Sequence, residues 1–279
     1  MRPTNLATIE QSNLIMPSRN LNYEQLNQKL VWQLKDYLQE SKQKWFVVWI
    51  SWGIDSAVVS TLCAQTGEKV IALCMPIHQK QEEIDRWLEH INWLKSKFGN
   101  VENYNIDLTE TFEIFKKTLP PISDEKALHM TLVNLRSRLR MNALYALANW
   151  NSSVVVWTGN KVEDYGIWFF TKYGDGWVDI SPIWALYKSE VYGLWCYNWI
   201  IKSILEARPT DGLHLNWATD EDQIWCSYDE LEWAMTQYDD WKRVKDFEEG
   251  SLERYVMEVY TSRHEWNAHK MQMPRIFDI

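Results

Sequence analysis

The sequence predicts an α/β fold with a doubly wound, mostly parallel sheet that is flanked by helices. The first observation is that short apolar runs alternate along the chain with segments of helical period, as in such sheets. The second is that the first strong apolar run, 46–50, leads directly into a helix-like segment. The third is the length of 279 residues, which suffices for one large domain with a full hydrophobic core. We therefore expect an N-terminal extension over 1–22 and a single domain over 23–279.

The individual elements follow from this alternation. Strands are predicted where apolar residues cluster in short runs, at 46–50, 69–75, 102–106 and 153–157. Helices are predicted where apolar residues recur at helical spacing, at 21–41, 55–65, 81–98, 108–117, 125–149, 188–206, 228–237 and 251–265. Gly67 and Gly99 are expected as helix C-caps. Residues 166–182 contain glycines and aromatics with few periodic positions, so we expect a long functional loop there.

Composition excludes several classes of protein. The formal net charge of −9 argues against nucleic acid as the main partner, because a phosphate backbone requires a basic face. No run of residues approaches the length of a membrane span, and the N-terminus lacks a signal-peptide pattern, so we expect a soluble, cytoplasmic protein with no membrane partner. Neither zinc nor a disulfide framework is indicated. Buried free thiols are expected at all four cysteines, which are Cys63, Cys74, Cys196 and Cys226.

A polar turn at 51–56, Ser-Trp-Gly-Ile-Asp-Ser, joins the first predicted strand to its helix. Unpaired amides at a helix N-terminus, together with the hydroxyls of Ser51 and Ser56, suit an anion, and Asp55 suits the magnesium that accompanies a phosphate. The turn has no lysine followed by serine or threonine, so it is not a Walker-type loop. An ordinary helix N-cap explains the same residue types, because serine and aspartate are favoured there. The turn alone therefore leaves both readings open.

A second polar turn, 157–160, follows the last predicted strand. Ligands of such sheets bind outside the carboxyl ends of the strands, so both turns are expected to face one nucleotide. Thr158 suits a hydrogen bond to adenosine or phosphate, and Glu163 is near enough in sequence to share a cation with Asp55. A plain turn threonine and a solvated carboxylate at a helix start are the alternatives for these two residues.

Three further segments appear in order along the chain. Residues 157–165 read Trp-Thr-Gly-Asn-Lys-Val-Glu-Asp-Tyr, 169–176 read Phe-Phe-Thr-Lys-Tyr-Gly-Asp-Gly, and 179–182 read Asp-Ile-Ser-Pro. Together they resemble the ammonia-dependent NAD synthetases over about 23–278, and 51–56 is similar to the Ser-Gly-Gly-x-Asp-Ser loop of the N-type ATP pyrophosphatases. This resemblance implies a Rossmann-like fold of the adenine nucleotide alpha hydrolase type.

The resemblance also implies roles for individual residues. Asp55 and Glu163 would hold Mg²⁺, and Lys188 would neutralise the polyphosphate. Asp175, within 169–176, is our own candidate for binding ammonium and accepting its proton. The alternatives are a surface lysine at 188, one solvated stripe of Arg136, Arg138 and Arg140, and an ordinary tail at 269–270. ATP would be bound by Ser51, Gly53, Ile54, Asp55, Ser56, Thr158, Lys188 and Thr210, and deamido-NAD by Arg138, Lys172, Asp179, His269 and Lys270.

The implied reaction has two steps. The nicotinate carboxylate of deamido-NAD attacks the α-phosphorus of ATP, which gives an acyl adenylate and pyrophosphate, and ammonia then displaces AMP. The cysteines lack a recognisable nucleophile context, so free ammonia is the expected nitrogen source. The resemblance implies a homodimer with the dinucleotide site near the subunit interface. Related pyrophosphatases that act on XMP or tRNA are disfavoured by 169–176 and by the acidic charge balance.

Tryptophan is abnormally frequent in this chain, with 18 residues against 10 glycines. The departures from the family pattern are of one kind, because tryptophan stands at family glycine positions. Small-to-large changes in packed regions cost about 1–3 kcal/mol each. The alternative function is therefore a catalytically impaired or engineered synthetase-fold scaffold whose nucleotide pocket is occluded by indoles. The departing positions are Trp49, Trp52, Trp157, Trp168, Trp177 and Trp217, with Ala185 at an expected aspartate and His214 to Ala218 in a stretch usually rich in Asp, Gly and Arg.

Overall fold

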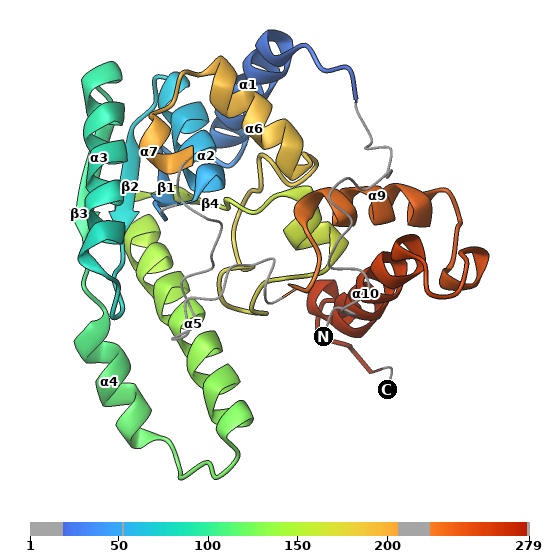
Figure 1. The fold of residues 1–279 in the computed structure, drawn as a ribbon. Helices are drawn as coiled ribbons and strands as arrows, with labels where there is room; N and C mark the ends of the chain where they lie inside the picture. Colours follow the sequence, from blue (N-terminus) through green and yellow to red (C-terminus); the bar gives the residue numbers. More distant parts are fainter. Residues whose placement is uncertain (1–18, 52, 206–223, 278–279) are drawn as a thin grey trace.

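The computed structural model describes residues 19–51, 53–205 and 224–277. Four parallel strands form its sheet in the order β3-β2-β1-β4 (Figure 1). Both faces of the central strands are covered, which is why their sequences read as continuous apolar runs rather than as alternating ones. The strands are β1 (Trp45–Trp49), β2 (Val70–Cys74), β3 (Val101–Asn105) and β4 (Ser153–Val156).

Helices pack on both faces of this sheet. Neighbouring residues of a strand point to opposite faces, so Phe46 and Val48 of β1 lie in one core and Val47 lies in the other. The first core takes residues from α1 (Tyr23–Glu40), α2 (Ile54–Gln65), α3 (Gln81–Lys97) and α6 (Lys188–Tyr197). The second takes residues from α4 (Thr109–Thr118) and α5 (Glu125–Asn151). The predicted doubly wound fold is confirmed.

A third, smaller core lies beside the sheet layers. It is formed by α9 (Tyr228–Asp239), α10 (Leu252–Asn267) and the π-helical turn η2 (Val162–Gly166), which follows β4 (Figure 1). Because η2 comes directly after β4, this core lies next to the carboxyl end of that strand. The remaining short elements are α7 (Lys202–Leu205), η3 (Val244–Asp246) and η4 (Ala268–Met271).

The predicted element boundaries agree with the structure except at two places. The helix predicted over 188–206 is wrong, because α6 ends at Tyr197 and α7 begins at Lys202. Trp199 lies between them with φ of 52°, a left-handed conformation that cannot continue a helix. Gly67 follows α2 with φ of 80°, as a C-terminal glycine should. The cap predicted at Gly99 is wrong, because Phe98 ends α3 in an extended conformation.

The long loop predicted at 166–182 is confirmed, since after η2 its link to the sheet is one isolated bridge between Val156 and Ile180. The four cysteines are free, but the prediction that all are buried is wrong, because Cys196 is exposed on α6. Within the described ranges, every helix is too short or too polar to cross a lipid bilayer.

Candidate active site

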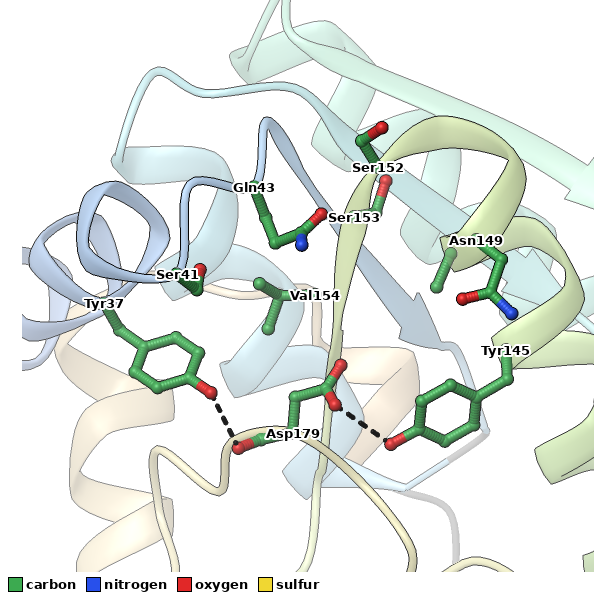
Figure 2. A pocket seen from close by; sticks show the side chains of 10 residues that line it. Tyr37, Ser41, Gln43, Tyr145, Asn149, Ser152, Ser153, Val154 and Asp179 are labelled. Carbon is green, nitrogen blue, oxygen red and sulfur yellow. Dashed lines mark hydrogen bonds between the residues drawn. The ribbon is translucent and has the colours of Figure 1, made fainter.

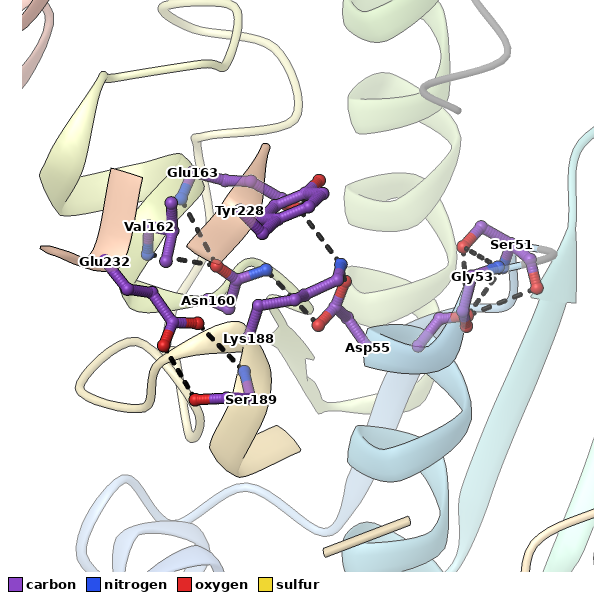
Figure 3. Close-up of polar contacts among 11 residues, drawn as sticks. Ser51, Gly53, Asp55, Asn160, Val162, Glu163, Lys188, Ser189, Tyr228 and Glu232 are labelled. Atoms are coloured by element: carbon purple, nitrogen blue, oxygen red, sulfur yellow. Dashed lines mark hydrogen bonds and ion pairs between the residues drawn. The ribbon is translucent and has the colours of Figure 1, made fainter. Parts of the chain in front are cut away.

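The turn at 51–56 connects the carboxyl end of β1 to the N-terminus of α2. Its two serines bind each other: the Ser51 N–H donates to Ser56 Oγ at 3.1 Å, and the two hydroxyl oxygens are 3.0 Å apart. The Gly53 N–H donates to Ser51 Oγ at 3.2 Å (Figure 3). Among the described residues no side chain caps the N-terminus of α2, where Ile54 begins the helix. Amides at a helix N-terminus suit an anion, and here they belong to the buried residues Ile54, Asp55 and Ser56.

Three charged side chains meet beside this turn. Asp55 of α2, Glu163 of η2 and Lys188 at the start of α6 lie far apart in sequence and are all largely buried. The Lys188 ammonium forms an ion pair with Asp55 Oδ2, and its Nζ lies 3.0 Å from Glu163 Oε1 (Figure 3). Asp55 and Glu163 therefore contact the same ammonium, and the surface-lysine alternative for Lys188 is wrong because its side chain is 5% exposed.

Two neutral residues complete the cluster. Asn160 donates from Nδ2 to Asp55 Oδ1 at 3.3 Å, while its Oδ1 accepts the amides of Val162 and Glu163 and so begins η2. The Tyr228 hydroxyl donates to Glu163 Oε1 at 2.6 Å. Asn160 could have been predicted as a site residue, because it lies within the second polar turn, 157–160. Tyr228 was missed, because only the packing of α9 against η2 brings it to the site.

Burial and charge act in opposite directions on the two carboxyls. Burial raises the pKa of Asp55 to about 6, although the Lys188 ammonium partly offsets that effect. Burial alone would also raise the pKa of Glu163, but Lys188 and the Tyr228 hydroxyl together lower it below its ordinary value. With Glu163 ionised, Asp55 is the carboxyl that takes a proton first as the pH falls. When both carboxyls are ionised, their two negative charges exceed the single positive charge of Lys188, so the site can bind a further cation.

A buried carboxylate holds the start of α6, which carries Lys188. Glu232 of α9 is fully buried and accepts the Ser189 amide at 2.9 Å and the Ser189 hydroxyl at 2.7 Å (Figure 3). Glu190 caps the same turn by accepting the Tyr187 amide at 2.9 Å. Carboxylates at a helix N-terminus are stabilised by the helix dipole. The position of Lys188 therefore depends on α9 as well as on its own helix.

The residues implied to bind the dinucleotide fall into two groups. In the first, the C-terminal segment contacts the loop 166–182. Lys172 donates to the carbonyls of His269 and Gln272 at 2.9 and 3.0 Å, and Lys270 donates to those of Trp168 and Phe170 at 2.7 and 2.8 Å. The segment 269–270 is therefore packed against the loop 166–182.

Arg138 joins this first group, because its guanidinium donates to the Lys172 carbonyl at 3.3 Å. The alternative of one solvated arginine stripe is wrong, since Arg136 and Arg140 are buried while Arg138 is exposed. Arg136 lies over the Phe112 ring and Arg140 over the Trp49 ring, at 4.4 and 4.7 Å from the ring centroids. Only Arg138 of the three presents its side chain to solvent.

Asp179 lies apart from this group, in a cavity of about 370 Å³ at the amino end of β4 (Figure 2). Its carboxylate accepts the Val155 amide at 2.7 Å and the Tyr145 hydroxyl at 3.1 Å, and the Tyr37 hydroxyl reaches its carbonyl at 3.5 Å. The two tyrosines flank Asp179 from opposite sides (Figure 2). Both were missed, because α1 and α5 are remote in sequence from Asp179.

The remaining predicted residues are placed as follows. The Asp175 carboxylate accepts the Thr171 amide at 2.8 Å within the loop 166–182. Thr158 is half-buried immediately after β4. Thr210, like Trp52 and Trp217, lies outside the described residues.

Comparison with known proteins gives consistent relatives. The NAD synthase family model matches residues 26–274. The NH3-dependent NAD synthetase of Mycoplasma genitalium is 37% identical over 202 residues, which cover 71% of this chain and 77% of that protein. The corresponding protein of Alkaliphilus metalliredigens is 33% identical over 266 residues, with 90% and 97% covered.

Solved structures give a similar result. An NMN synthetase from Francisella tularensis superposes with a TM-score of 0.79 at 30% identity, over 93% of this chain and all of that one. The NH3-dependent NAD synthetase of Campylobacter jejuni superposes with a TM-score of 0.73 at 24% identity, over 92% of this chain and all of that one, which shows the shared fold.

Proposed function

Because this chain belongs to the NAD synthase family, we propose that it amidates deamido-NAD to NAD with free ammonia, at the expense of ATP. The observation that supports this most is the buried ammonium of Lys188 between Asp55 and Glu163, at the N-terminal turn of α2. A helix N-terminus and a lysine favour polyphosphate, and the two carboxylates favour its counter-cation. This arrangement suits transfer of an adenylyl group.

The chemistry requires an activated carboxylate. A free carboxylate resists attack by ammonia because its leaving group would be oxide. In the proposed reaction the nicotinate carboxylate attacks the α-phosphorus of ATP, and pyrophosphate leaves into the turn at 51–56. The amides of α2 and the Lys188 ammonium stabilise the charge that accumulates on that pyrophosphate. Ammonia then attacks the acyl carbon, a proton leaves the nitrogen, and AMP departs.

Asp175 is proposed to bind ammonium and to accept that proton. Its carboxylate is held in place by the Thr171 amide. An Asp175→Asn variant should form the acyl adenylate but transfer it slowly to ammonia. Full amidation from a preformed adenylate by this variant would refute the role.

Magnesium fits the donor set of this site. Mg²⁺ prefers oxygen ligands and is commonly held by one or two carboxylates together with substrate phosphates. Asp55 and Glu163 supply two carboxylates at one point, with one ammonium between them. These two residues would hold the ion, which would neutralise phosphate charge when bound. ATP binding should therefore depend on Mg²⁺ and on both carboxylates.

The dinucleotide is proposed to lie between two sets of residues. Lys172, Lys270 and Arg138 supply cations near the loop 166–182 for its phosphates. The cavity around Asp179 offers tyrosine rings from α1 and α5, which suit an aromatic base. His269 adjoins Lys270 on the C-terminal segment.

Amidation of the mononucleotide, nicotinate mononucleotide, is a second candidate. It is favoured by the similarity to the NMN synthetase structure. Such a reaction needs no site for a second nucleotide. The rates of amidation of nicotinate mononucleotide and of deamido-NAD distinguish the two candidate functions. A Tyr145→Ala variant should lower the rate with deamido-NAD only.

The assembly is proposed to be a homodimer that works in the cytoplasm. Ile114, Phe115 and Met130 lie exposed on α4 and α5, which project from the sheet (Figure 1). Exposed apolar side chains gathered on one projection are typical of interaction surfaces.

The direct test of the proposed site is Lys188→Met, assayed by pyrophosphate release with deamido-NAD, ATP and Mg²⁺. Loss of the ammonium should reduce kcat/KM by at least about 100-fold, as removal of one preorganised charged donor does. Lys161→Met is the matched control, because Lys161 is also partly buried but contacts Tyr187 and Asp239 instead. Equal rates for wild type and Lys188→Met would contradict the proposed site.

A further inference from the structure

Left-handed backbone positions in this protein carry an unusual residue. Within the described residues, two glycines and eight other residues have φ between about 50° and 80°. Four of those eight are Trp168, Trp199, Trp225 and Trp241, whereas the other four belong to four different residue types. A β-carbon disfavours this conformation, and a bulky side chain makes it a genuine outlier.

Trp199 occupies the position after α6 where glycine is most favoured. Its N–H donates to the Cys196 carbonyl at 3.2 Å, and the Ile200 N–H donates to the Trp195 carbonyl at 3.4 Å. These two bonds define a Schellman motif, whose left-handed residue is usually glycine. Trp199 has φ of 52° and is that residue.

Trp241 occupies the same position after α9. Its N–H donates to the Tyr238 carbonyl at 3.0 Å, and the Lys242 N–H donates to the Gln237 carbonyl at 2.9 Å. Trp241 has φ of 64°. After α2, Gly67 fills the equivalent place with φ of 80° and a bond from its N–H to the Ala64 carbonyl. Within the described residues the same pair of bonds also follows α1, at Lys42 with φ of 57°, whereas Gly67 after α2 makes the first of the two bonds.

The indoles at these two positions are not explained by packing. Trp199 is 87% exposed and Trp241 is 82% exposed. The Trp241 ring lies 5.7 Å from the Arg243 guanidinium, which is a loose surface contact. Trp168 is buried, yet its indole N–H has no hydrogen-bond partner among the described residues. Trp199 and Trp241 therefore have the backbone conformation that favours glycine while their indoles are exposed, whereas the buried Trp168 ring stacks on His264 at 5.6 Å.

The composition points the same way. The chain has 18 tryptophans and 10 glycines, and the family motifs expect glycine where Trp52, Trp157 and Trp177 stand. The codon UGA, which some genetic codes read as tryptophan, differs from the glycine codon GGA only in its first base. We propose that the cell that makes this protein reads UGA as glycine, so that the natural protein carries glycine at positions 199 and 241 and at the other tryptophans with left-handed backbone.

This inference does not rest on the proposed function, so it is tested without an activity assay. The first measurement is tandem mass spectrometry of tryptic peptides from the protein purified from the cells that naturally make it. The gene is sequenced alongside to read codons 199 and 241. Glycine in both peptides and UGA at both codons are expected. Tryptophan in either peptide, or UGG at either codon, would overturn the proposal.

The second measurement concerns the backbone argument. In the chain with the present sequence, Trp199→Gly and Trp241→Gly should each raise Tm by about 2–4 °C, because strain at one left-handed residue is relieved. Trp32→Gly is the matched control, since Trp32 is also exposed but lies inside α1, where glycine disfavours the helix. Its Tm should fall. If Trp199→Gly and Trp241→Gly also lower Tm, then left-handed backbone at these two tryptophans does not destabilise the protein, and the proposal loses its structural basis.

Discussion

At the scale of single residues, buried ionisable groups dominate the behaviour of this protein. Asp55, Glu163 and Lys188 balance one another at the site, and Asp164 is buried beside them. Burial raises the pKa of Asp164 well above its ordinary value. His90 of α3 is a different case, because it is fully buried, and among the described residues its one hydrogen bond is between Nε2 and Ser60 Oγ at 2.9 Å.

His90 should make stability depend on pH. Burial lowers its pKa from 6.5 to about 3. Below pH 6.5 His90 is protonated in the unfolded chain but stays neutral in the folded protein. The free energy of unfolding therefore falls as the pH decreases toward about 3. The loss should approach about 1.4 kcal/mol per pH unit below 6.5.

Urea unfolding at pH 7 and pH 5 measures this contribution. His90→Gln keeps a polar partner for Ser60 but does not titrate, so its difference between the two pH values should be smaller by about 2 kcal/mol. Ser60→Ala is the control, because it leaves the buried imidazole in place and should retain the wild-type difference. An unchanged difference in His90→Gln would show that the imidazole is not responsible.

At the scale of elements, the site depends on how three helix starts meet. Asp55 lies in the first turn of α2, Lys188 begins α6 and Tyr228 begins α9. The motifs at 51–56 and 157–165 indicated Asp55 and Glu163, and the resemblance as a whole implied Lys188. Tyr228 and Glu232 could not be predicted, since their roles depend on the packing of α9, which no local pattern encodes.

Glu232 should position Lys188 through the first turn of α6. Glu232→Gln keeps the side-chain size but removes the charge that faces the helix N-terminus and one of the two oxygens that accept hydrogen bonds from Ser189. The loss should be about 1–2 kcal/mol, which is roughly a tenfold decrease in kcat/KM for ATP. Glu253→Gln in the first turn of α10 is the control and should leave kcat/KM unchanged. A Glu232→Gln enzyme with wild-type kcat/KM would exclude this positioning role.

The same scale explains the errors in element boundaries. The apolar period continues from 188 to 206, so it indicates one helix. The break at Trp199 comes from a left-handed residue, and tryptophan gives no sequence signal for that conformation. Glycine at this position would have given the usual stop signal. The central strands β1 and β2 were easier to predict, because burial on both faces makes them uninterrupted apolar runs.

At the scale of the whole molecule, helices α4 and α5 extend beyond the sheet that they cover (Figure 1). Ile114, Phe115 and Met130 are between 47% and 57% exposed there. A homodimer that uses this surface would bury them.

Sedimentation equilibrium tests this assembly. The wild-type chain should sediment as a dimer, and Phe115→Arg should shift it toward monomer by placing a charge in an apolar contact. Trp150→Arg, at the opposite end of α5 and 74% exposed, should remain dimeric. A monomeric wild type, or a dimeric Phe115→Arg, would contradict the use of this surface.

The central claim is that the site couples adenylation of a nicotinate carboxylate to amide formation. The most direct measurement uses the chain with glycine at positions 52, 199 and 241, supplied with ATP, Mg²⁺, ¹⁵N-ammonium and deamido-NAD. The account predicts ¹⁵N-labelled NAD formed in equal amount with AMP and pyrophosphate, and no AMP when deamido-NAD is omitted. A folded protein that releases no AMP with deamido-NAD, or releases it without forming labelled NAD, would contradict the account.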